Sequence, residues 1–349
     1  MLKKIDQYLQ NKYEKTEYPA LDFQRNLWLK EKPLKGKRIL DATPVFANTL
    51  LKYAAMIAAG ADLTIGYSES IPYDPEIIHF LKKSGIPCRT DITEKGSFDA
   101  ILDCNGVFRD LKPKYGFAEL TRSGAYRFEG TADPVILVDD SRIKAIETCL
   151  GTGESFLRAM LHLGYHEIAG KKILVFGCGK VGRGVVFYAG RAGAEVIAVD
   201  DPSMVVRHVG GRLLDRANRA EVLAEMKQAW CIVSATGKRS ALAEKEYLEI
   251  VRNGPQILAN MGVEDEWGPS LPAERVLNRK APLNFILPEP TLLRYIDPTM
   301  ALHNHAAVEL VNSESLPGIR KPSPVVEQNY WKITEENGLI AGELSAAGL

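Results

Sequence analysis

The sequence has few cysteines, and their arrangement does not indicate a disulfide framework. Five occur in 349 residues, the number is odd, and no C-x-x-C is present. This pattern favours reduced thiols in a cytoplasmic protein over a secreted domain or a zinc site, so no metal site is predicted. The five are Cys88, Cys104, Cys149, Cys178 and Cys231.

Long apolar runs and an excess of charge of either sign are also lacking. No window approaches about 18 uncharged apolar residues, and the first residues, MLKKIDQYLQNKYEK, contain no apolar core, so we expect neither a membrane span nor a signal peptide. Lysine plus arginine and aspartate plus glutamate number 44 each. This balance gives no reason to expect a nucleic acid or a membrane as a partner.

Short apolar runs alternate with helical patterns along most of the chain, which indicates α/β domains with parallel sheets. The expected strands are 38–40, 61–65, 98–103, 173–176, 196–199, 231–234 and 256–259. The expected helices are 1–31, 47–59, 75–83, 141–163, 243–252 and 300–311. Prolines become dense between 269 and 290, which indicates a linker out of the second domain.

The most informative stretch is KKILVFGCGKVGRGVVFYAGRAGAEVIAVDD, residues 171–201. An apolar strand is followed by Gly177, Gly179 and Gly182 in G-x-G-x-x-G spacing, and then by a helix and a second strand. In such a loop the first glycine permits the tight turn, the second lets the backbone approach a pyrophosphate, and the third lets helix and strand pack closely. The helix N-terminus offers free N–H groups to the phosphates. The stretch therefore predicts a Rossmann domain that binds a dinucleotide.

Asp200 ends the second strand, 18 residues after Gly182. A carboxylate there accepts hydrogen bonds from the adenosine ribose hydroxyls and repels a 2′-phosphate, which favours NAD over NADP. Arg207 is close enough in sequence to leave NADP open.

Between residues 33 and 310 the chain carries, in order, KPLKGKRIL, IAAGADL, SGIPC, FDAILDCNG, GFAELTRSGAYR, DDSRIKAIE, LGTGESFLRAM, IAGKKILVFGCGKVGRGV, VSATGK and ILANMG. With these segments the chain resembles the S-adenosylhomocysteine hydrolase (adenosylhomocysteinase) family. The resemblance implies two α/β domains that close on a tightly held NAD, and we expect a homo-oligomer. It also implies oxidation of a ribose 3′-hydroxyl, elimination of a thiol, addition of water and reduction of the ketone.

The resemblance implies a set of cofactor contacts. Lys180 and Val181 complete the phosphate loop, and Thr148 replaces a family asparagine. The remaining matches are Thr121, Arg122, Ser123, Thr236, Gly237, Asn260, Met261 and Gly262.

On the substrate side the resemblance makes Lys144 the catalytic lysine. Glu147 stands opposite the family's catalytic aspartate, and Asp103 is the first aspartate of its L-D-D-G-G. Lysine can take a hydroxyl proton if burial or a nearby positive charge lowers its pKa. On the expected helix Lys144 and Glu147 share a face. From this spacing alone, a surface salt bridge is the alternative.

Other family residues are replaced. Where the family has a histidine this chain has Pro44, and where the family has an aspartate it has Cys104. Leu120 occupies the position of a family glutamate, and Val263 that of a second histidine. Cys104 lies where α/β sheets bind ligands, and we interpret it as a small buried residue rather than a nucleophile.

The histidines give no firm site. His303 and His305 are interpreted as structural or surface residues, with a substrate contact as the alternative. His162 and His166 have metal-pair spacing, but no acid or cysteine accompanies them, and a helix surface is the expected environment.

The sequence thus predicts two doubly wound parallel-sheet domains, with the NAD-binding Rossmann domain, 151–292, inserted into a discontinuous substrate domain, 1–150 and 293–349. The expected function is NAD-dependent oxidation of a secondary hydroxyl of a small-molecule substrate in an interdomain cleft, as an oxidoreductase or a hydrolase/lyase, with a substrate other than S-adenosylhomocysteine. A true adenosylhomocysteinase, a catalytically silent NAD-binding regulator and a D-2-hydroxy-acid-type dehydrogenase remain alternatives.

Overall fold

The computed structural model describes residues 1–205, 209–312 and 316–349. The chain forms two compact units. Unit 1 consists of Met1–Lys144 and Leu293–Gly342, and unit 2 of Ala145–Leu292 and Glu343–Leu349. Unit 2 is therefore inserted into unit 1. Its first residue comes six positions before the expected 151, and the last seven residues of the chain group with unit 2 rather than with unit 1.

Unit 1 contains a seven-stranded sheet whose strand pairs are all parallel. In spatial order the strands are β12 (Gly318–Arg320), β6 (Pro134–Leu137), β5 (Phe117–Glu119), β4 (Ala100–Asp103), β1 (Arg38–Asp41), β2 (Asp62–Gly66) and β3 (Cys88–Arg89). From β1 the chain moves outward through β2 to β3, and it then returns to β4 on the other side of β1. The topological switch point of the sheet therefore lies between β1 and β4.

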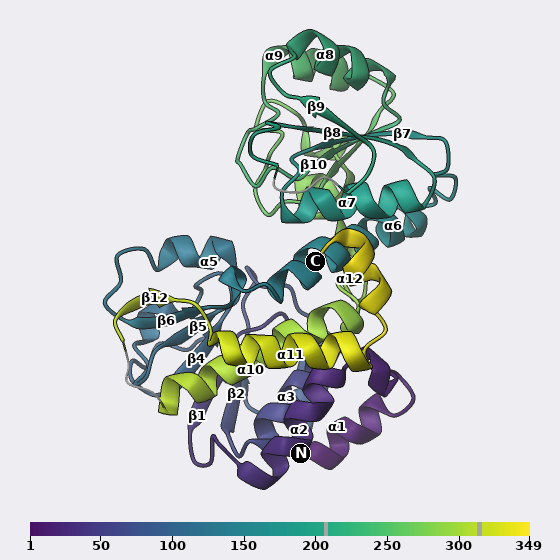
Figure 1. Cartoon of the computed structure of the whole chain (residues 1–349). Coiled ribbons are helices and arrows are strands. Elements are labelled where there is room, and N and C mark those ends of the chain that lie inside the picture. Colours follow the sequence, from purple (N-terminus) through teal and green to yellow (C-terminus); the bar gives the residue numbers. More distant parts are fainter. Residues whose placement is uncertain (206–208, 313–315) are drawn as a thin grey trace. The chain divides into compact units, whose positions relative to one another are not determined.

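The helices of unit 1 are α1 (Leu2–Leu9), α2 (Pro19–Glu31), α3 (Thr49–Ala58), α4 (Pro75–Lys83), α5 (Arg122–Arg127), α10 (Leu293–Asn312) and α11 (Pro324–Asn337). Short 3-10 turns are Lys15–Glu17, Arg109–Leu111 and Val138–Asp140. Helices α10 and α11 lie side by side, so α11 packs on the helix with which the chain returns to unit 1 (Figure 1).

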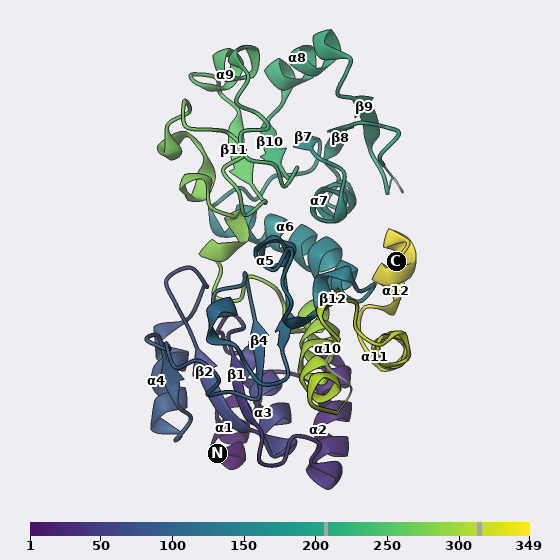
Figure 2. The same cartoon turned by 90° about the vertical axis from the view of Figure 1, so that its left-hand side faces the viewer.

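Unit 2 contains a five-stranded parallel sheet in the order β11 (Ile257–Asn260), β10 (Cys231–Ser234), β7 (Lys172–Phe176), β8 (Glu195–Asp200) and β9 (Arg212–Asp215). Its switch point lies between β7 and β10. The helices are α6 (Thr152–His162), α7 (Lys180–Arg191), α8 (Arg219–Gln228) and α9 (Lys245–Val251), preceded by a π-helix, Ile146–Gly151. Turns of 3-10 type are Ala273–Arg275, Leu277–Lys280 and Leu283–Ile286, and α12 (Ala341–Ala347) ends the chain. Helix α7 lies beside β7 and β8 in both ribbon views (Figures 1 and 2).

Side chains of β7 alternate between two apolar cores, because successive residues of a strand point to opposite faces. Val175 packs with Phe156 of α6 and Val185 of α7, whereas Leu174 packs with Val222 of α8 and Leu248 of α9. Both faces of the sheet are thus covered by helices. The predicted fold class, two parallel-sheet α/β domains, is confirmed.

Several elements differ from the expectation. The helical lead-in consists of two helices, α1 and α2, and the expected helix 141–163 is interrupted by the π-helix. Helix α10 begins seven residues before the expected residue 300 and contains Pro298. No sequence pattern predicted β3, β5, β6, β9, β12, α5, α8, α11 and α12.

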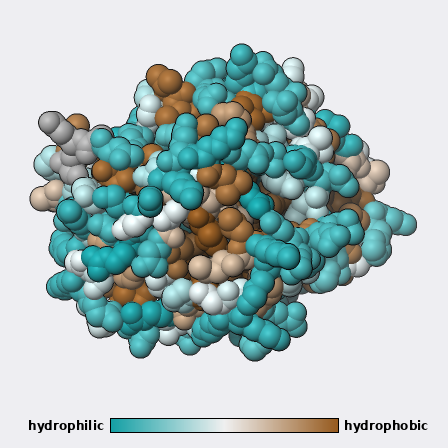
Figure 3. Space-filling model, turned by 90° about the horizontal axis from the view of Figure 1, so that it is seen from below, coloured by the Kyte–Doolittle hydropathy of each residue, from teal (hydrophilic) through white to brown (hydrophobic). Residues whose placement is uncertain are grey.

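Most of the surface visible in Figure 3 is hydrophilic. In the view of Figure 3, hydrophobic residues gather near the centre of the face and are surrounded by hydrophilic ones. Phe23, Leu27 and Leu29 of α2 are among the large apolar side chains that are exposed. Within the three described ranges, none of the helices has the length and apolar character that crossing a membrane requires.

Candidate functional site

The glycine-rich loop of unit 2 has two positions where no side chain fits. Gly177 follows β7 with φ +94°, and a β-carbon there would lie 2.5 Å from the carbonyl oxygen of Ala235. A β-carbon on Gly182 would lie 1.9 Å from the carbonyl oxygen of Gly177. Gly177 therefore makes the turn, and Gly182 allows α7 to pack against the end of β7.

Gly179 has a different environment, because a β-carbon there would meet no heavy atom within 4 Å. It is the N-cap of α7, and no side chain caps this helix start. The first N–H groups of a helix lack intrahelical partners. The helix therefore begins with open space over Gly179. Lys180 is the exposed first residue of α7, and Val181 packs partly against the core.

Two more glycines let α7 approach the elements before it in unit 2. A β-carbon on Gly184 would lie 1.8 Å from the carbonyl oxygen of Cys149, and one on Gly153 would lie 2.3 Å from the backbone of Gly184. The G-R-G extension of the motif thus has a packing reason that the sequence analysis did not identify.

Asp200 connects the end of β8 to the glycine loop. Its Oδ2 accepts a 2.6 Å hydrogen bond from the Cys178 amide, and its Oδ1 accepts one of 2.8 Å from the Asp201 amide. A carboxylate has about four lone-pair positions, so further acceptor capacity remains. Arg216, which the sequence analysis did not single out, forms an ion pair of 3.5 Å with Asp201. Arg207, the basis of the NADP alternative, lies outside the described residues, as does His208.

The turn after β10 is held by a glutamate that sequence reasoning missed. Glu266 accepts hydrogen bonds from the amide and hydroxyl of Thr236, at 2.9 and 2.7 Å, and from the amide of Gly237 at 2.7 Å. Glu266 is fully buried, and burial raises the pKa of its carboxyl. A β-carbon on Gly262 would lie 2.3 Å from Glu266 Oε1, so the predicted glycine also makes room for this carboxyl.

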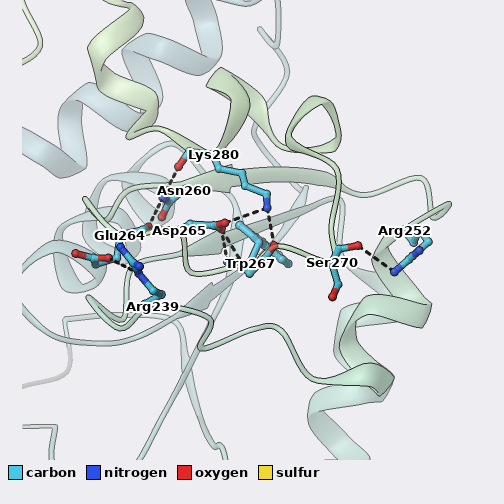
Figure 4. Close-up of polar contacts among 9 residues, drawn as sticks. Arg239, Arg252, Asn260, Glu264, Asp265, Trp267, Ser270 and Lys280 are labelled. Carbon is cyan, nitrogen blue, oxygen red and sulfur yellow. Dashed lines mark hydrogen bonds and ion pairs between the residues drawn. The ribbon is translucent and has the colours of Figure 1, made fainter. Parts of the chain in front are cut away.

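Asn260, at the end of β11, holds the loop that follows it (Figure 4). Its amide nitrogen donates to the carbonyl oxygens of Gly262, Glu264 and Lys280, at 3.0, 2.9 and 2.7 Å. Lys280 Nζ in turn bonds Asp265 Oδ2 at 3.1 Å. Met261 is buried, and its amide donates to Ser234. The loop is thus held by side-chain hydrogen bonds.

In unit 1 the switch point places two aspartates at neighbouring strand ends. Asp41 ends β1 and Asp103 ends β4, and both are fully buried. Ligands of open α/β sheets bind outside the carboxyl ends of strands at this position. The loops that follow β1 and β4 contain Pro44 and Cys104. The topology therefore places Pro44 and Cys104, which replace two residues of the family, at the edge of the sheet where a ligand is expected to bind.

Asp103 and Glu119 hold the loop after β4. Asp103 accepts hydrogen bonds from the amides of Cys104, Val107 and Phe108, at 2.8 to 3.2 Å. Glu119 accepts from the amides of Asn105 and Gly106, at 3.0 and 2.9 Å. Burial raises the pKa of both carboxyls, and the neighbouring charge of Glu119 raises that of Asp103 further. Asp103, which was predicted to be catalytic, thus holds the loop after β4 by accepting hydrogen bonds from its backbone amides.

The predicted residues after β5 are engaged locally within unit 1. Thr121 donates its hydroxyl to Glu119 at 2.6 Å and, as the N-cap of α5, accepts the Gly124 amide at 3.0 Å. The hydroxyl of Ser123 donates to that of Thr121 at 3.3 Å. Arg122 forms ion pairs with Asp139 and Asp140. These contacts hold the segment within unit 1.

Lys144 is the last residue of unit 1, and its side chain is buried. Glu147 and Thr148 lie in the π-helix of unit 2 and are partly buried. A π-helix closes i to i+5 hydrogen bonds, so residues three apart have another angular relation than in an α-helix. The expected helix is therefore not a continuous α-helix here, and the shared face of Lys144 and Glu147 stays a prediction. Single-turn π-segments are frequent at functional sites.

A buried polar cluster beside Asp41 was not predicted. Asp41 is bonded to Lys52 of α3, and both side chains have no exposed surface. His303 of α10 donates from Nε2 to the carbonyl of Ala118 at 2.9 Å, and its Nδ1 is 3.5 Å from the Thr43 hydroxyl. Burial and the Lys52 charge lower the pKa of His303 to about 3, so it is neutral. His303 is thus structural, and His305 bonds Tyr330 at 3.2 Å.

The remaining candidates are the five cysteines and two histidines. All five cysteines are buried, and none forms a disulfide. His162 and His166 belong to no set of three or more possible metal ligands, and the described part of the chain contains no such set.

Known proteins support the family resemblance. The chain is 29% identical over 283 residues to the S-inosyl-L-homocysteine hydrolase of Methanosarcina acetivorans, covering 72% of this chain and 67% of that protein. It is 27% identical over 269 residues to the adenosylhomocysteinase of Archaeoglobus fulgidus, covering 68% and 65%. The chain is a divergent relative of the adenosylhomocysteinases. It spans about two thirds of the length of these curated relatives.

Two further comparisons concern the fold. No family model matches the chain. The crystal structure of a dipicolinate synthase polypeptide from Bacillus halodurans superposes with a TM-score of 0.51 at 15% identity, covering 80% of this chain and 99% of that one. At this identity the likeness shows the fold alone, and it agrees with two α/β units.

Proposed function

We propose that this adenosylhomocysteinase relative is an NAD-dependent enzyme that oxidises a secondary hydroxyl of a small substrate. The observation that carries the proposal is the glycine loop of unit 2. Gly182 cannot carry a side chain, whereas the space over Gly179, at an uncapped helix start, is open. A helix N-terminus of this kind binds phosphate through its N–H groups and its dipole.

The residues of unit 2 fit NAD. The amides at the start of α7 would hold the pyrophosphate, and the remaining lone pairs of Asp200 would accept the ribose hydroxyls. Thr236, Gly237, Asn260, Met261 and Gly262 stand on two fixed loops, after β10 and β11, at the carboxyl edge of the sheet. The negative charge of Asp200 would repel a 2′-phosphate, which supports NAD over NADP.

Lys144 of unit 1 and Glu147 of unit 2 would supply the acid–base chemistry. When bound, NAD supplies the hydride acceptor. Lys144 would take the proton from the substrate hydroxyl, which requires a neutral amine and therefore a pKa lowered by burial or by a neighbouring positive charge. Glu147 would orient the lysine or tune its charge. Asp103 and Glu119 would keep the loop after β4 in place.

The substrate class follows from the relatives and from the replaced positions. The names of the relatives differ in the base, adenosyl or inosyl, so the base varies within this group. Here Pro44, Cys104, Leu120 and Val263 replace four family residues. These changes support a nucleoside-like or other small hydroxyl substrate that differs from S-adenosylhomocysteine.

The cofactor assignment is tested by measuring the dissociation constants of NAD and NADP calorimetrically. We expect wild type to bind NAD more tightly than NADP. Asp200→Ala should weaken NAD binding and reduce the difference in affinity between NAD and NADP. Asp201→Ala is the matched control, because Asp201 is the next carboxylate and bonds Ser203 at its own turn. Equal affinities of wild type for both dinucleotides would remove the assignment.

A further inference from the structure

The last residues of unit 1 before the chain enters unit 2 have their backbone amides held by side chains. The Lys144 amide donates to Ser141 Oγ at 3.1 Å. The Ile143 amide donates to Glu327 Oε1 at 3.1 Å, and the Arg142 amide donates to the same oxygen. The first amides of a helical segment have no partner within it. Lys144 begins the helical residues here and Arg142 and Ile143 precede it, and side chains accept hydrogen bonds from all three amides.

Glu327 belongs to α11, which is distant in sequence and contacts the same segment a second time. The guanidinium of Arg142 lies over the ring of Trp331, 3.6 Å from its centroid. Glu327 and Trp331 are four residues apart on α11, so they share one face of the helix. Trp331 is 3% exposed, which makes this contact part of the packed structure rather than a surface pairing.

Helix α11 is itself fixed within unit 1. The hydroxyl of Tyr330 accepts a 2.6 Å hydrogen bond from Gln24 of α2, and it lies 3.2 Å from His305 Nδ1 of α10. Tyr330 is buried. Glu327 is therefore presented to residues 142 and 143 from a helix that α2 and α10 also hold in place.

We propose that Glu327 is a positioning residue for Lys144. By holding two of the amides at the start of the segment, its carboxylate sets the backbone direction from which the lysine projects. The chemical consequence rests on the proposed function, in which Lys144 takes the hydroxyl proton. Displacement of a reacting group by about 1 Å can cost about 100-fold in rate.

The backbone part is tested by hydrogen–deuterium exchange of residues 142–144 in the full chain. Glu327→Ala removes the acceptor, and we expect exchange about fivefold faster, as for the loss of one cap worth about 1 kcal/mol. Glu327→Gln keeps an acceptor oxygen and should retain most of the protection. Glu336→Ala is the control, because Glu336 on the same helix makes only an exposed pair with Lys332 at 3.7 Å among the described contacts. Unchanged exchange in Glu327→Ala would refute the capping role.

The side-chain part is tested by NMR of protein carrying lysine labelled at Cε, with the Lys144 signal assigned by Lys144→Met. We expect the signal to move in Glu327→Ala but not in Glu327→Gln or Glu336→Ala. An unmoved signal in Glu327→Ala would refute positioning even if exchange increases. Where S-inosyl-L-homocysteine or S-adenosylhomocysteine is turned over, kcat should fall about tenfold or more, with KM and NAD affinity nearly unchanged. If neither probe reduces bound NAD in wild type, the proposed function is weakened, whereas the exchange and NMR results still decide the role of Glu327.

Discussion

Gly182 lies so close to Gly177 that a β-carbon on Gly182 would stand 1.9 Å from the carbonyl oxygen of Gly177. Gly179, between them in sequence, has no atom within 4 Å of the same hypothetical carbon. One motif thus contains a glycine required for packing and a glycine beside open space. The two requirements can be separated by single substitutions.

Gly182→Ala should destabilise unit 2, because the clash is with backbone and the helix must move away from β7. Overpacking of this kind costs about 1–3 kcal/mol. Gly190→Ala in the same helix is the control: a β-carbon there meets nothing within 4 Å, so stability should stay equal or rise by about 0.5–1 kcal/mol. The unfolding midpoint in urea checks both. A Gly182→Ala protein as stable as wild type would contradict the packing role.

Gly179→Ala should leave stability nearly unchanged, because its backbone, at φ −73° and ψ −159°, is open to alanine. The added methyl would occupy the space proposed for the pyrophosphate, so NAD affinity should fall at least about tenfold, or 1.4 kcal/mol. Calorimetric titration with NAD measures this. Unchanged affinity would place the phosphates elsewhere.

The glycine loop could be predicted from sequence because its requirements are local. Turn, helix start and packing all lie within a few residues of one another, and the apolar strands β7, β8, β10 and β11 are buried on both faces. Strands such as β5, with three residues, and β9, with one buried residue, carry too few apolar positions for a periodic signal. The π-helix likewise has no pattern of its own.

The supporting side chains of the site could not be predicted, because their partners are remote in sequence. Glu266 holds Thr236 from 30 positions away, and Glu327 holds Arg142 from 185 positions away. Nothing local distinguishes these carboxylates from surface glutamates. The family resemblance gave positions for Lys144 and Asp103, but only the structure shows that Asp103 is engaged by three backbone amides.

A buried aspartate should make the stability of unit 1 depend on pH. Asp297 of α10 accepts the amides of Ala20 and Leu21 at the start of α2, each at 2.9 Å. Burial raises the pKa of Asp297 to about 7, whereas an unfolded aspartate has a pKa of about 3.9. The native state thus retains the proton longer. Its stabilising contribution is complete below pH of about 4 and is lost as pH rises through about 7.

Asp297→Asn should remove this dependence, since asparagine does not titrate. The difference in unfolding free energy between wild type and Asp297→Asn should therefore be more favourable to wild type at pH 5 than at pH 8. This difference in unfolding free energy should change with pH by at most about 1.4 kcal/mol per pH unit. Urea unfolding at both values measures it, with the exposed Asp110→Asn as control. A difference that grows toward pH 8 would show that Asp297 is ionised in the native state.

S-adenosylhomocysteine should be a poor substrate. Four positions that the family uses on the substrate side are Pro44, Cys104, Leu120 and Val263 here, and each lost acid–base group costs about 10²–10⁴-fold. Release of homocysteine thiol measures hydrolysis, and S-inosyl-L-homocysteine should be tested in parallel. A turnover of S-adenosylhomocysteine of about 1 s⁻¹ or more, within the ordinary range of enzymes, would make the replacements tolerable and the chain a true adenosylhomocysteinase.

The role of Lys144 separates the proposed enzyme from a silent NAD-binding protein. If Lys144 takes the hydroxyl proton, Lys144→Met should abolish reduction of bound NAD by a substrate while leaving NAD affinity intact, because the glycine loop and Asp200, which would hold the dinucleotide, lie in unit 2. Glu147→Gln should have a smaller effect, since it would orient the lysine rather than accept the proton. Lys227→Met, which removes an exposed lysine of α8, is the control for loss of one positive charge.

The measurement is the absorbance of bound NADH in a single turnover, with the homocysteine nucleosides first and other small secondary alcohols after them. The expected order of rates is wild type and Lys227→Met, then Glu147→Gln, then Lys144→Met at background. Removal of a general base lowers the rate about 10²–10⁴-fold, so the loss of rate in Lys144→Met is large enough to measure. A Lys144→Met protein that reduces its NAD as fast as wild type would make the lysine a structural residue at the end of unit 1. The proton would then have to leave through another group.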